Sequence, residues 1–403
     1  MAYKVTTKTS YGQRLSGSFK SIGTGFLMFI GATILLFWNE GSFVKTKKSL
    51  QEAEGVLVRV YDVSEVDPSL SGKLIHASAF ADTEETLIDG LFGISERAIA
   101  INRNVEYYQY EEKSSTQTRD LIGGGQETVT TYTYDKRWTS KPVHSGSFQD
   151  PSFQQSNFVL TTVEAKAERA KDVSFGAYRL PPFIISAISG NVPAAVNLTE
   201  DEIEQWGQTI ARSAPNVAPS AQIVHISGNV VYFGNSPTTP NIGDLRITLT
   251  KVMPADISVI AKVIGTTFEP YIAKNGKSVS SVSMGTVSAE NMFAGEHSAN
   301  KTITWILRLV GIFLVIGGLK SIFSILPTLF KVLPFLGKIV GAGVGLVCTI
   351  AGGAWSLVII SLAWLFYRPL IGVPMLLAAV AGIWYLRKVA KKKETAVETV
   401  NNE

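Results

Sequence analysis

Long runs of apolar residues stand out at both ends of the chain. The runs at 22–38, 339–367 and 370–386 carry no charged residue, and the run at 303–319 carries only Arg308. A bilayer core about 30 Å thick is crossed by roughly 17–25 helical residues, whereas a helix in a globular core is not uncharged over such lengths. We therefore predict a multi-pass α-helical membrane protein with four transmembrane helices, one N-terminal and three C-terminal.

The first run must be weighed against a cleaved signal peptide, because basic residues precede it. The residues that follow, Trp38 to Gly41, contain no small-x-small cleavage motif, and the run is long for the apolar part of a signal peptide. An uncleaved membrane anchor is therefore the favoured interpretation.

Residues 39–302 have a polar composition that favours strands. Aromatic and β-branched runs at Val105–Glu112 and Thr128–Trp138 flank a glycine-containing loop and predict a long hairpin. Further strands are expected at Gln222–Phe233, Asp244–Lys251 and Asp256–Ile264, each bounded by Gly, Pro or Asn. The region is thus predicted to be one large α+β, strand-rich domain.

Two helices are predicted in this domain. Thr199–Ser213 begins with a capping box, in which Thr199 and Glu202 have the S/T-x-x-E spacing, and acidic residues crowd its first turn. Val163–Lys171 is a second, weaker helical candidate.

Charge separates the two kinds of region. The chain carries a net charge of +4, which divides into −7 over residues 39–301 and +11 over the remainder. The basic residues gather in the tail 1–21, in the connection 320–338 and in the tail 387–403. The last of these contains a polybasic group made of Arg387, Lys388, Lys391, Lys392 and Lys393.

With four spans, these three basic segments fall on one side of the membrane, which the excess of Lys and Arg predicts to be the cytoplasm. Both termini are then cytoplasmic, and the domain at 39–302 is exported into a periplasm, a lumen or the extracellular space. The single cysteine, Cys348, lies in the third run, so the domain has no disulfide. This favours a bacterial inner membrane, with the endoplasmic reticulum or inner nuclear membrane expected if the source is eukaryotic.

Known catalytic patterns are missing from the sequence. The four histidines, at positions 76, 144, 225 and 297, have no metal-binding spacing, and no nucleophile elbow or phosphate-binding loop is present. We therefore predict no enzyme activity, no cofactor, no metal site and no nucleic-acid partner.

Small residues recur every fourth position along the third run. They are Gly337, Gly341, Gly345, Thr349 and Gly353. In lipid, small residues at this spacing let helix backbones approach closely, so they predict a contact face. Two partners remain open for it: a second copy of the chain, or this chain's own second or fourth span.

Three charged residues are predicted at one depth near the outer ends of the spans. Glu40 ends the first span, Arg308 lies about one turn inside the second, and Arg368 lies between the third and fourth. A charge beside hydrocarbon is costly unless it pairs or reaches the headgroups, so we expect Glu40 to pair with Arg308 or Arg368 in an outer charge collar. In the alternative interpretation, each reaches the headgroups separately.

The connection at 320–338 has apolar residues on one helical face and is interrupted by Pro327 and Pro334. We expect either an amphipathic helix lying on the cytoplasmic leaflet or a kinked continuation of the second span.

Short motifs along almost the whole chain resemble those of the LUMA (transmembrane protein 43) family. In order, they are Asn39-Glu40-Gly41, Lys45-Thr46, Ser49-Leu50, Val105-Glu106, Tyr108-Gln109, Tyr132, Tyr134, Trp138, Gly243-Asp244-Leu245-Arg246, Val259-Ile260-Ala261, Ser288-Ala289-Glu290, Phe293, Trp305, Leu307-Arg308, Gly311 and Ala363-Trp364-Leu365-Phe366-Tyr367-Arg368-Pro369-Leu370. Alignment by eye fails between Asp150 and Gln222. The resemblance implies a non-enzymatic multi-pass protein of a bacterial type. Its animal relatives self-associate and organise membrane complexes with lamins and emerin, but no residue of this chain is tied to those partners.

Two hypotheses of function follow. In the first, the protein is an integral membrane scaffold that forms homo-oligomers through its spans and organises unknown membrane or envelope protein partners through its exported domain. In the second, it is an envelope receptor or accessory subunit whose domain binds a ligand and signals through the bundle. A polar pocket with convergent charged groups would favour the second hypothesis.

Overall fold

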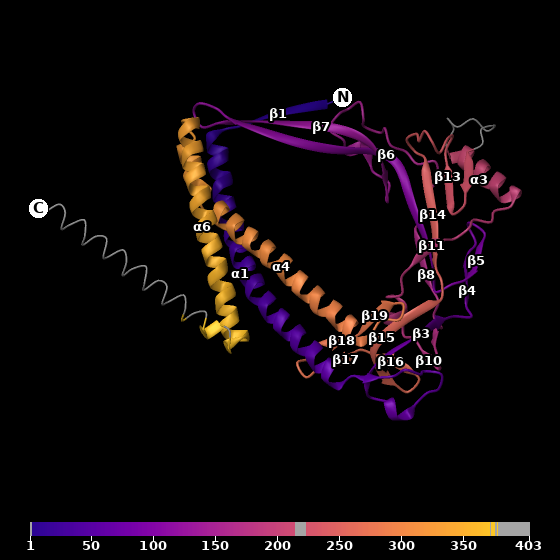
Figure 1. Ribbon diagram of the computed structural model, residues 1–403. Helices are drawn as coiled ribbons and strands as arrows, with labels where there is room; N and C mark the ends of the chain where they lie inside the picture. The colour runs from indigo at the N-terminus through magenta and orange to yellow at the C-terminus, as the bar shows by residue number, and fades with distance from the viewer. Residues whose placement is uncertain (1, 214–222, 371, 375–376, 378–403) are drawn as a thin grey trace, which may run out of the picture. The chain divides into compact units, whose positions relative to one another are not determined.

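The computed structural model describes residues 2–213, 223–370, 372–374 and 377, which fall into two compact units (Figure 1). The strand-rich unit contains the described residues of 1–7, 52–118 and 128–294. The helical unit contains residues 8–51 and 119–127, together with the described residues from 295 onward.

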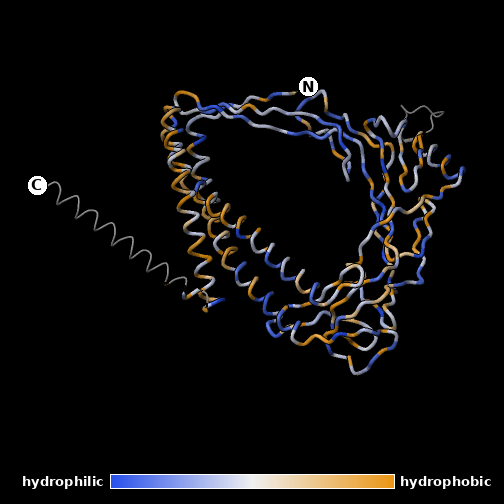
Figure 2. The backbone as a smooth tube through the Cα atoms, viewed as in Figure 1, coloured by the Kyte–Doolittle hydropathy of each residue, from blue (hydrophilic) through white to orange (hydrophobic). Residues whose placement is uncertain are grey.

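The helical unit is built on three long helices, each long and apolar enough to cross a membrane. They are α1 (Tyr11–Val56), α4 (Ala289–Ile322) and α6 (Pro334–Tyr367). All three contain a predicted apolar run, and α1 and α4 extend well beyond theirs because the flanking residues are polar helix formers. Figure 2 shows the apolar residues along α6 and the middle of α1. The fourth predicted span, 370–386, lies almost entirely outside the described residues.

Close backbone contacts join α1 to α4. A Cβ atom added at Gly25 would lie 2.8 Å from the Gly318 carbonyl oxygen, and one added at Gly318 would lie 2.9 Å from the Gly25 carbonyl oxygen. Leu36 of α1, Val315 of α4 and Ile359 of α6 form part of one buried apolar cluster. The three helices therefore pack as a bundle.

The connection at 320–338 is divided by its prolines. α4 ends at Ile322, the short helix α5 (Ile325–Phe330) follows, and α6 starts at Pro334. Proline is favoured in the first turn of a helix because the missing N–H has no partner there. The segment is therefore not one continuous amphipathic helix: it consists of the end of α4, the short helix α5 and the start of α6.

The strand-rich unit contains two large sheets, each covering its own apolar core. The larger sheet has the order β1-β7-β6-β14-β13-β12, with β8 beside β6 and β11 beside β14. Its strands are β1 (Ala2–Thr9), β6 (Ala100–Asp120), β7 (Gln126–Thr139), β8 (Lys166–Arg169), β11 (Asn191–Pro193), β12 (Val224–Ser227), β13 (Val230–Phe233) and β14 (Leu245–Val252).

The second sheet has the order β10-β9-β3-β15-β16, with β2 parallel to β3 and β19 beside β15. Its strands are β2 (Val58–Arg59), β3 (Leu74–Asp82), β9 (Ser174–Phe175), β10 (Tyr178–Arg179), β15 (Ala255–Ile264), β16 (Thr267–Glu269) and β19 (Ser281–Met284). Two small hairpins and two helices complete the unit: β4 (Thr86–Asp89) with β5 (Ile94–Arg97), β17 (Tyr271–Ile272) with β18 (Ser278–Val279), α2 (Pro182–Ile185) and α3 (Glu200–Ser213).

Most of the elements predicted for the domain are present. The long hairpin is formed by β6 and β7, and β14 and β15 match two predicted strands. The run predicted as one strand at 222–233 instead holds β12 and β13, which pair antiparallel around a turn at Gly228.

The two helix predictions have opposite outcomes. α3 is confirmed with its capping box, because the Glu202 carboxylate accepts from the Thr199 amide at 2.8 Å and the Thr199 hydroxyl accepts from the Glu202 amide at 3.3 Å. The helix predicted at Val163–Lys171 is wrong: residues 166–169 form β8, which pairs antiparallel with β6. Here the free edge of a sheet outweighs local helix propensity.

Candidate functional site

Glu40 and Arg308 form a buried ion pair between α1 and α4. The Arg308 Nε donates to Glu40 Oε1 at 2.5 Å and its Nη2 donates to Glu40 Oε2 at 2.8 Å. Glu40 is completely buried, and the Arg308 side chain is 11% exposed. Two parallel hydrogen bonds to one carboxylate are the strongest arrangement available to an arginine.

Tryptophans complete the surroundings of this pair. Trp364 of α6 donates from Nε1 to Glu40 Oε2 at 2.8 Å, so the carboxylate joins all three long helices. The Arg308 guanidinium lies over the rings of Trp305 and Trp364, at 4.7 and 5.6 Å from their centroids. Such faces attract a cation without needing water.

Arg368, the third residue of the predicted collar, does not join this ion pair within the described part of the chain. Its guanidinium lies 4.4 Å from the centroid of Phe43 and 5.7 Å from that of Trp364. The structure thus brings Glu40 and Arg308 together and places Arg368 on a neighbouring aromatic surface. The polybasic group at 387–393 lies outside the described residues.

The two ends of the glycine stripe of α6, which consists of Gly337, Gly341, Gly345, Thr349 and Gly353, have different neighbours. A Cβ atom at Gly337 would meet Lys331 at 2.5 Å, and one at Gly341 would meet Pro327 at 3.5 Å, so this end faces the connection before α6. A Cβ atom at Gly345 or Gly353 would meet no described atom within 4 Å, and Thr349 is exposed.

A different face of α6 packs against α4. Gly352, which is outside the predicted stripe, is buried, and a Cβ atom there would lie 2.8 Å from the side chain of Ile316. Buried residues recur along this face, namely Cys348, Gly352, Ser356, Ile359 and Ala363. Sequence reasoning missed this face because its members are not all glycine, although their spacing was available as a signal.

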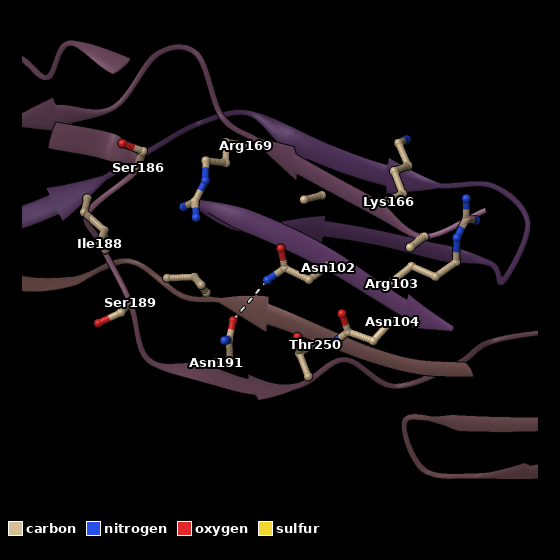
Figure 3. A pocket seen from close by; sticks show the side chains of 13 residues that line it. Asn102, Arg103, Asn104, Lys166, Arg169, Ser186, Ile188, Ser189, Asn191 and Thr250 are labelled. Atoms are coloured by element: carbon tan, nitrogen blue, oxygen red, sulfur yellow. Dashed lines mark hydrogen bonds between the residues drawn. The ribbon is translucent and has the colours of Figure 1, made fainter. Parts of the chain in front are cut away.

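A polar pocket of about 450 Å³ lies on the larger sheet of the strand-rich unit (Figure 3). Asn102 of β6, Thr250 of β14 and Arg169 of β8 contribute to its lining, together with Asn191 of β11 and Ser189 just before it. Asn102 donates from its amide to the Asn191 side-chain oxygen at 3.0 Å. The pocket was not predicted, because its residues come from four separate strands.

The charged side chains that line this pocket are all basic. No Asp or Glu is among its lining residues in the described part of the chain. Arg169 donates to the Ile185 carbonyl at 3.3 Å, which leaves guanidinium donors available. Arg103 and Lys166 also line the pocket but are paired with Asp89 and Glu168. The groups that can bind a small polar anion are therefore the amides, the hydroxyls and the Arg169 guanidinium.

A second cavity, of about 600 Å³, lies beside β2 and the start of α4. Its arginine, Arg59, is already paired with Glu290, and His76 is hydrogen-bonded to the Val287 carbonyl oxygen at 2.8 Å. Within the described residues, no cluster of three or more His, Cys, Asp or Glu side chains is placed to hold a metal ion.

Asp244 is a buried carboxylate in the strand-rich unit whose hydrogen bonds come from a tyrosine and an amide. The Tyr232 hydroxyl donates to its Oδ2 at 2.5 Å, and the Asn241 amide donates to the same atom at 2.8 Å. Burial raises the pKa of Asp244 above its ordinary value, while these two hydrogen bonds oppose the rise. Burial also raises the pKa of Tyr232.

Comparisons with known proteins extend over most of the chain. A family profile described as "Transmembrane protein 43" matches residues 107–369. The mouse protein named Transmembrane protein 43 is 29% identical over 381 residues, which cover 91% of this chain and 90% of the mouse protein. The human protein of that name is 27% identical over 378 residues, covering 91% and 89% of the two chains. A Drosophila melanogaster homolog is 26% identical over 375 residues, covering 91% and 94%.

No solved structure matches the chain. The profile match includes Arg308, Trp364 and the glycine stripe, and the relatives align over nearly their full lengths. The chain therefore belongs to the transmembrane protein 43 family.

Proposed function

We propose that this protein is a non-enzymatic integral membrane scaffold, which self-associates through its helices and organises membrane protein complexes through its strand-rich domain. The observation that carries the proposal is the open part of the α6 stripe. Gly345 and Gly353 lie on one helical face with Thr349, and no described atom would contact a Cβ atom at either glycine.

The chemistry of this face suits contact with another helix in lipid. The Thr349 hydroxyl donates to the Gly345 carbonyl within its own helix at 2.7 Å, so it needs no outside partner. What remains is a shallow surface of two glycines and a threonine methyl group. Such a surface allows a second helix to approach closely, and close packing is a main source of helix association in membranes.

The test is chemical crosslinking in native membranes of chains carrying Gly345→Ile or Gly353→Ile. We expect either substitution to lower the association constant by about tenfold, which corresponds to roughly 1.4 kcal/mol of lost association energy, and so to reduce the crosslinked oligomer. Gly343→Ile is the matched control, because Gly343 also has no atom within 4 Å of an added Cβ but lies on another face of α6. Oligomers that survive both stripe substitutions would overturn the proposal.

A second candidate function, binding of a small ligand by the strand-rich domain, is supported by the polar pocket around Arg169. The test is the thermal stability of the purified full chain titrated with inorganic phosphate or acetate. We expect stabilisation that Arg169→Gln abolishes and that the surface control Arg137→Gln leaves unchanged. An equal response of the wild type and Arg169→Gln would remove this candidate.

A further inference from the structure

Three charged side chains of the helical unit, Glu40, Arg308 and Arg368, gather around Trp364 near the end of α6. The Glu40 carboxylate is already occupied, because both of its oxygens accept from Arg308 and Oε2 also accepts from Trp364. Glu40 therefore balances the charge of Arg308 and leaves the charge of Arg368 unbalanced. Arg368 Nη2 is buried and has no hydrogen-bond partner among the described residues.

The neighbours of Arg368 hold its side chain without using its hydrogen-bond donors. The guanidinium lies over the ring of Phe43, at 4.4 Å from its centroid, and over that of Trp364 at 5.7 Å. An aromatic face attracts the cation, but the N–H groups point outward in the plane of the guanidinium and still need acceptors. The residue as a whole is only partly buried, so an acceptor can reach this plane from outside the bundle.

A second cation lies close to Arg368 on α1. Lys47 follows Phe43 by four residues, and side chains four apart are neighbours on one face of a helix. Phe43 is the α1 residue that contacts Arg368, and Lys47 is exposed one turn beyond it. The ends of α1 and α6 therefore present an arginine and a lysine to the same region of the surface.

These cations lie at the depth of the lipid headgroups. The apolar run of α1 ends at Trp38 and the run of α6 ends at Tyr367, so Phe43, Lys47 and Arg368 all follow shortly after an uncharged segment. Such positions mark the boundary between the hydrocarbon core and the headgroups, where tryptophan and tyrosine are also enriched. Trp364 and Tyr367 stand next to Arg368 in the sequence.

An exposed apolar surface of α6 borders the same region. The last turns of the helix expose Leu357, Leu362 and Phe366 at 62%, 49% and 73%, and Leu370 follows at 91%. A small soluble anion gains nothing from apolar surface beside its site. A phospholipid does, because its acyl chains cover that surface while its headgroup meets the cations.

We propose that Arg368 and Lys47 bind the phosphate of an anionic phospholipid at the adjoining ends of α1 and α6. The planar guanidinium suits two parallel hydrogen bonds to phosphate oxygens, and basic sites between membrane helices suit anionic headgroups. A net negative lipid is favoured over a zwitterionic one, because the ammonium group of the latter is repelled by both side chains. The site goes beyond the proposed scaffold function and does not depend on self-association.

The test is lipid binding by the purified full chain in a non-ionic detergent, measured by native mass spectrometry and thermal unfolding. Phosphatidylglycerol is the probe, and phosphatidylcholine with the same acyl chains is the comparison. We expect saturable binding of phosphatidylglycerol that weakens about tenfold in Arg368→Gln and about fivefold in Lys47→Gln. Equal affinity of wild type and Arg368→Gln, or equal binding of the two lipids, would overturn the proposal.

Lys20→Gln is the matched control, because Lys20 is an exposed lysine at the other end of the apolar run of α1. It removes the same charge, so it separates the site from general attraction of the protein to anionic lipid. We expect wild-type affinity in this variant, and a loss as large as that of Arg368→Gln would contradict the proposal. Arg368→Lys keeps the charge without the planar fork, so it should recover part of the affinity. If Arg368→Gln does not fold, wild-type affinity in both Lys47→Gln and Arg368→Lys would overturn the proposal.

Inorganic phosphate distinguishes a lipid headgroup from a soluble anion. In lipid-free detergent, we expect no phosphate response that depends on Arg368. A stabilisation by phosphate that is lost in Arg368→Gln but kept in Arg169→Gln would assign the site to a soluble anion and overturn the lipid assignment. A response lost only in Arg169→Gln belongs to the pocket of the strand-rich unit and leaves the lipid result to stand on the phosphatidylglycerol titration.

Discussion

The helical and strand-rich units both bury an arginine–carboxylate pair, but the two carboxylates differ in how many of their oxygens accept hydrogen bonds. In the helical unit, Glu40 receives two hydrogen bonds from Arg308 and one from Trp364, so both oxygens are occupied. In the strand-rich unit, Asp89 Oδ1 receives hydrogen bonds from Arg103 and the Leu91 amide, while Oδ2 has no hydrogen-bond partner among the described residues.

The difference belongs to the two carboxylates rather than to the two units. An unpaired polar atom costs about 1–3 kcal/mol in a protein interior, and more where no water can approach. Both oxygens of Glu40 are paired inside the bundle, but Asp120 Oδ1, Ser324 Oγ and Arg368 Nη2 of the helical unit have no hydrogen-bond partner among the described residues. Incomplete pairing like that of Asp89 is therefore tolerated in both units, and Glu40 is the fully paired exception.

Breaking the Glu40–Arg308 pair should have the largest effect on stability. We expect Glu40→Ala to lower the free energy of unfolding by about 4 kcal/mol, because it leaves the Arg308 charge buried without a partner. Adding Arg308→Met should recover a large part of this loss. The measurement is thermal unfolding of both variants in detergent, and purely additive effects would show that the two side chains are not coupled.

Breaking the pair in the strand-rich unit should cost less. We expect Arg103→Met to lower the free energy of unfolding by about 3 kcal/mol, since Asp89 keeps its hydrogen bond from the Leu91 amide and already has one unpaired oxygen. The same unfolding measurement checks the order of the two effects. A larger loss for Arg103→Met than for Glu40→Ala would reverse the comparison.

Removing only the tryptophan donor should have a smaller effect. Trp364→Phe keeps an aromatic ring but loses the hydrogen bond to Glu40, so we expect a loss of about 2 kcal/mol. Trp355→Phe is the matched control, because its indole donates at 3.0 Å to the neutral Thr33 hydroxyl. Equal losses in the two variants would mean that the charge of Glu40 adds nothing to the bond.

The smallest expected effect is the change in stability that acidification causes through Asp244, and its direction follows from the pKa shift. Burial raises its pKa, so the folded state binds this proton more tightly than the unfolded state does. The resulting stabilisation is present in acid and is lost as the pH rises through the raised value. As the pH falls from about 7 to about 4, wild type should gain stability relative to Asp244→Asn, which cannot titrate there. Parallel denaturant-unfolding curves for the two proteins would exclude this linkage.

The sequence predicted those elements whose signals are local. The β6–β7 hairpin follows from alternating aromatic and β-branched residues, and α3 follows from its capping box. The helix at 163–171 failed because the decisive factor, an open edge of β6, lies about sixty residues away. Local propensity carries no information about such an edge.

The candidate site shows the same limit. The cost of a charge near lipid identified Glu40, Arg308 and Arg368 as residues needing partners, but it did not distinguish between the two arginines. Helix packing makes that choice, since Arg308 reaches Glu40 while Arg368 lies over Phe43. The four-residue spacing likewise located a face of α6 but not Gly352, which is where α4 contacts it.

The Glu40 carboxylate also sets an order of events during synthesis. Arg308 follows it by 268 residues and Trp364 by 324, so most of the 403-residue chain is synthesised before either partner exists. Until then, the first helix ends in a carboxylate that has neither of these partners. The packing of the first helix against α4 and α6 through Glu40 is therefore completed only after most of the chain has been synthesised.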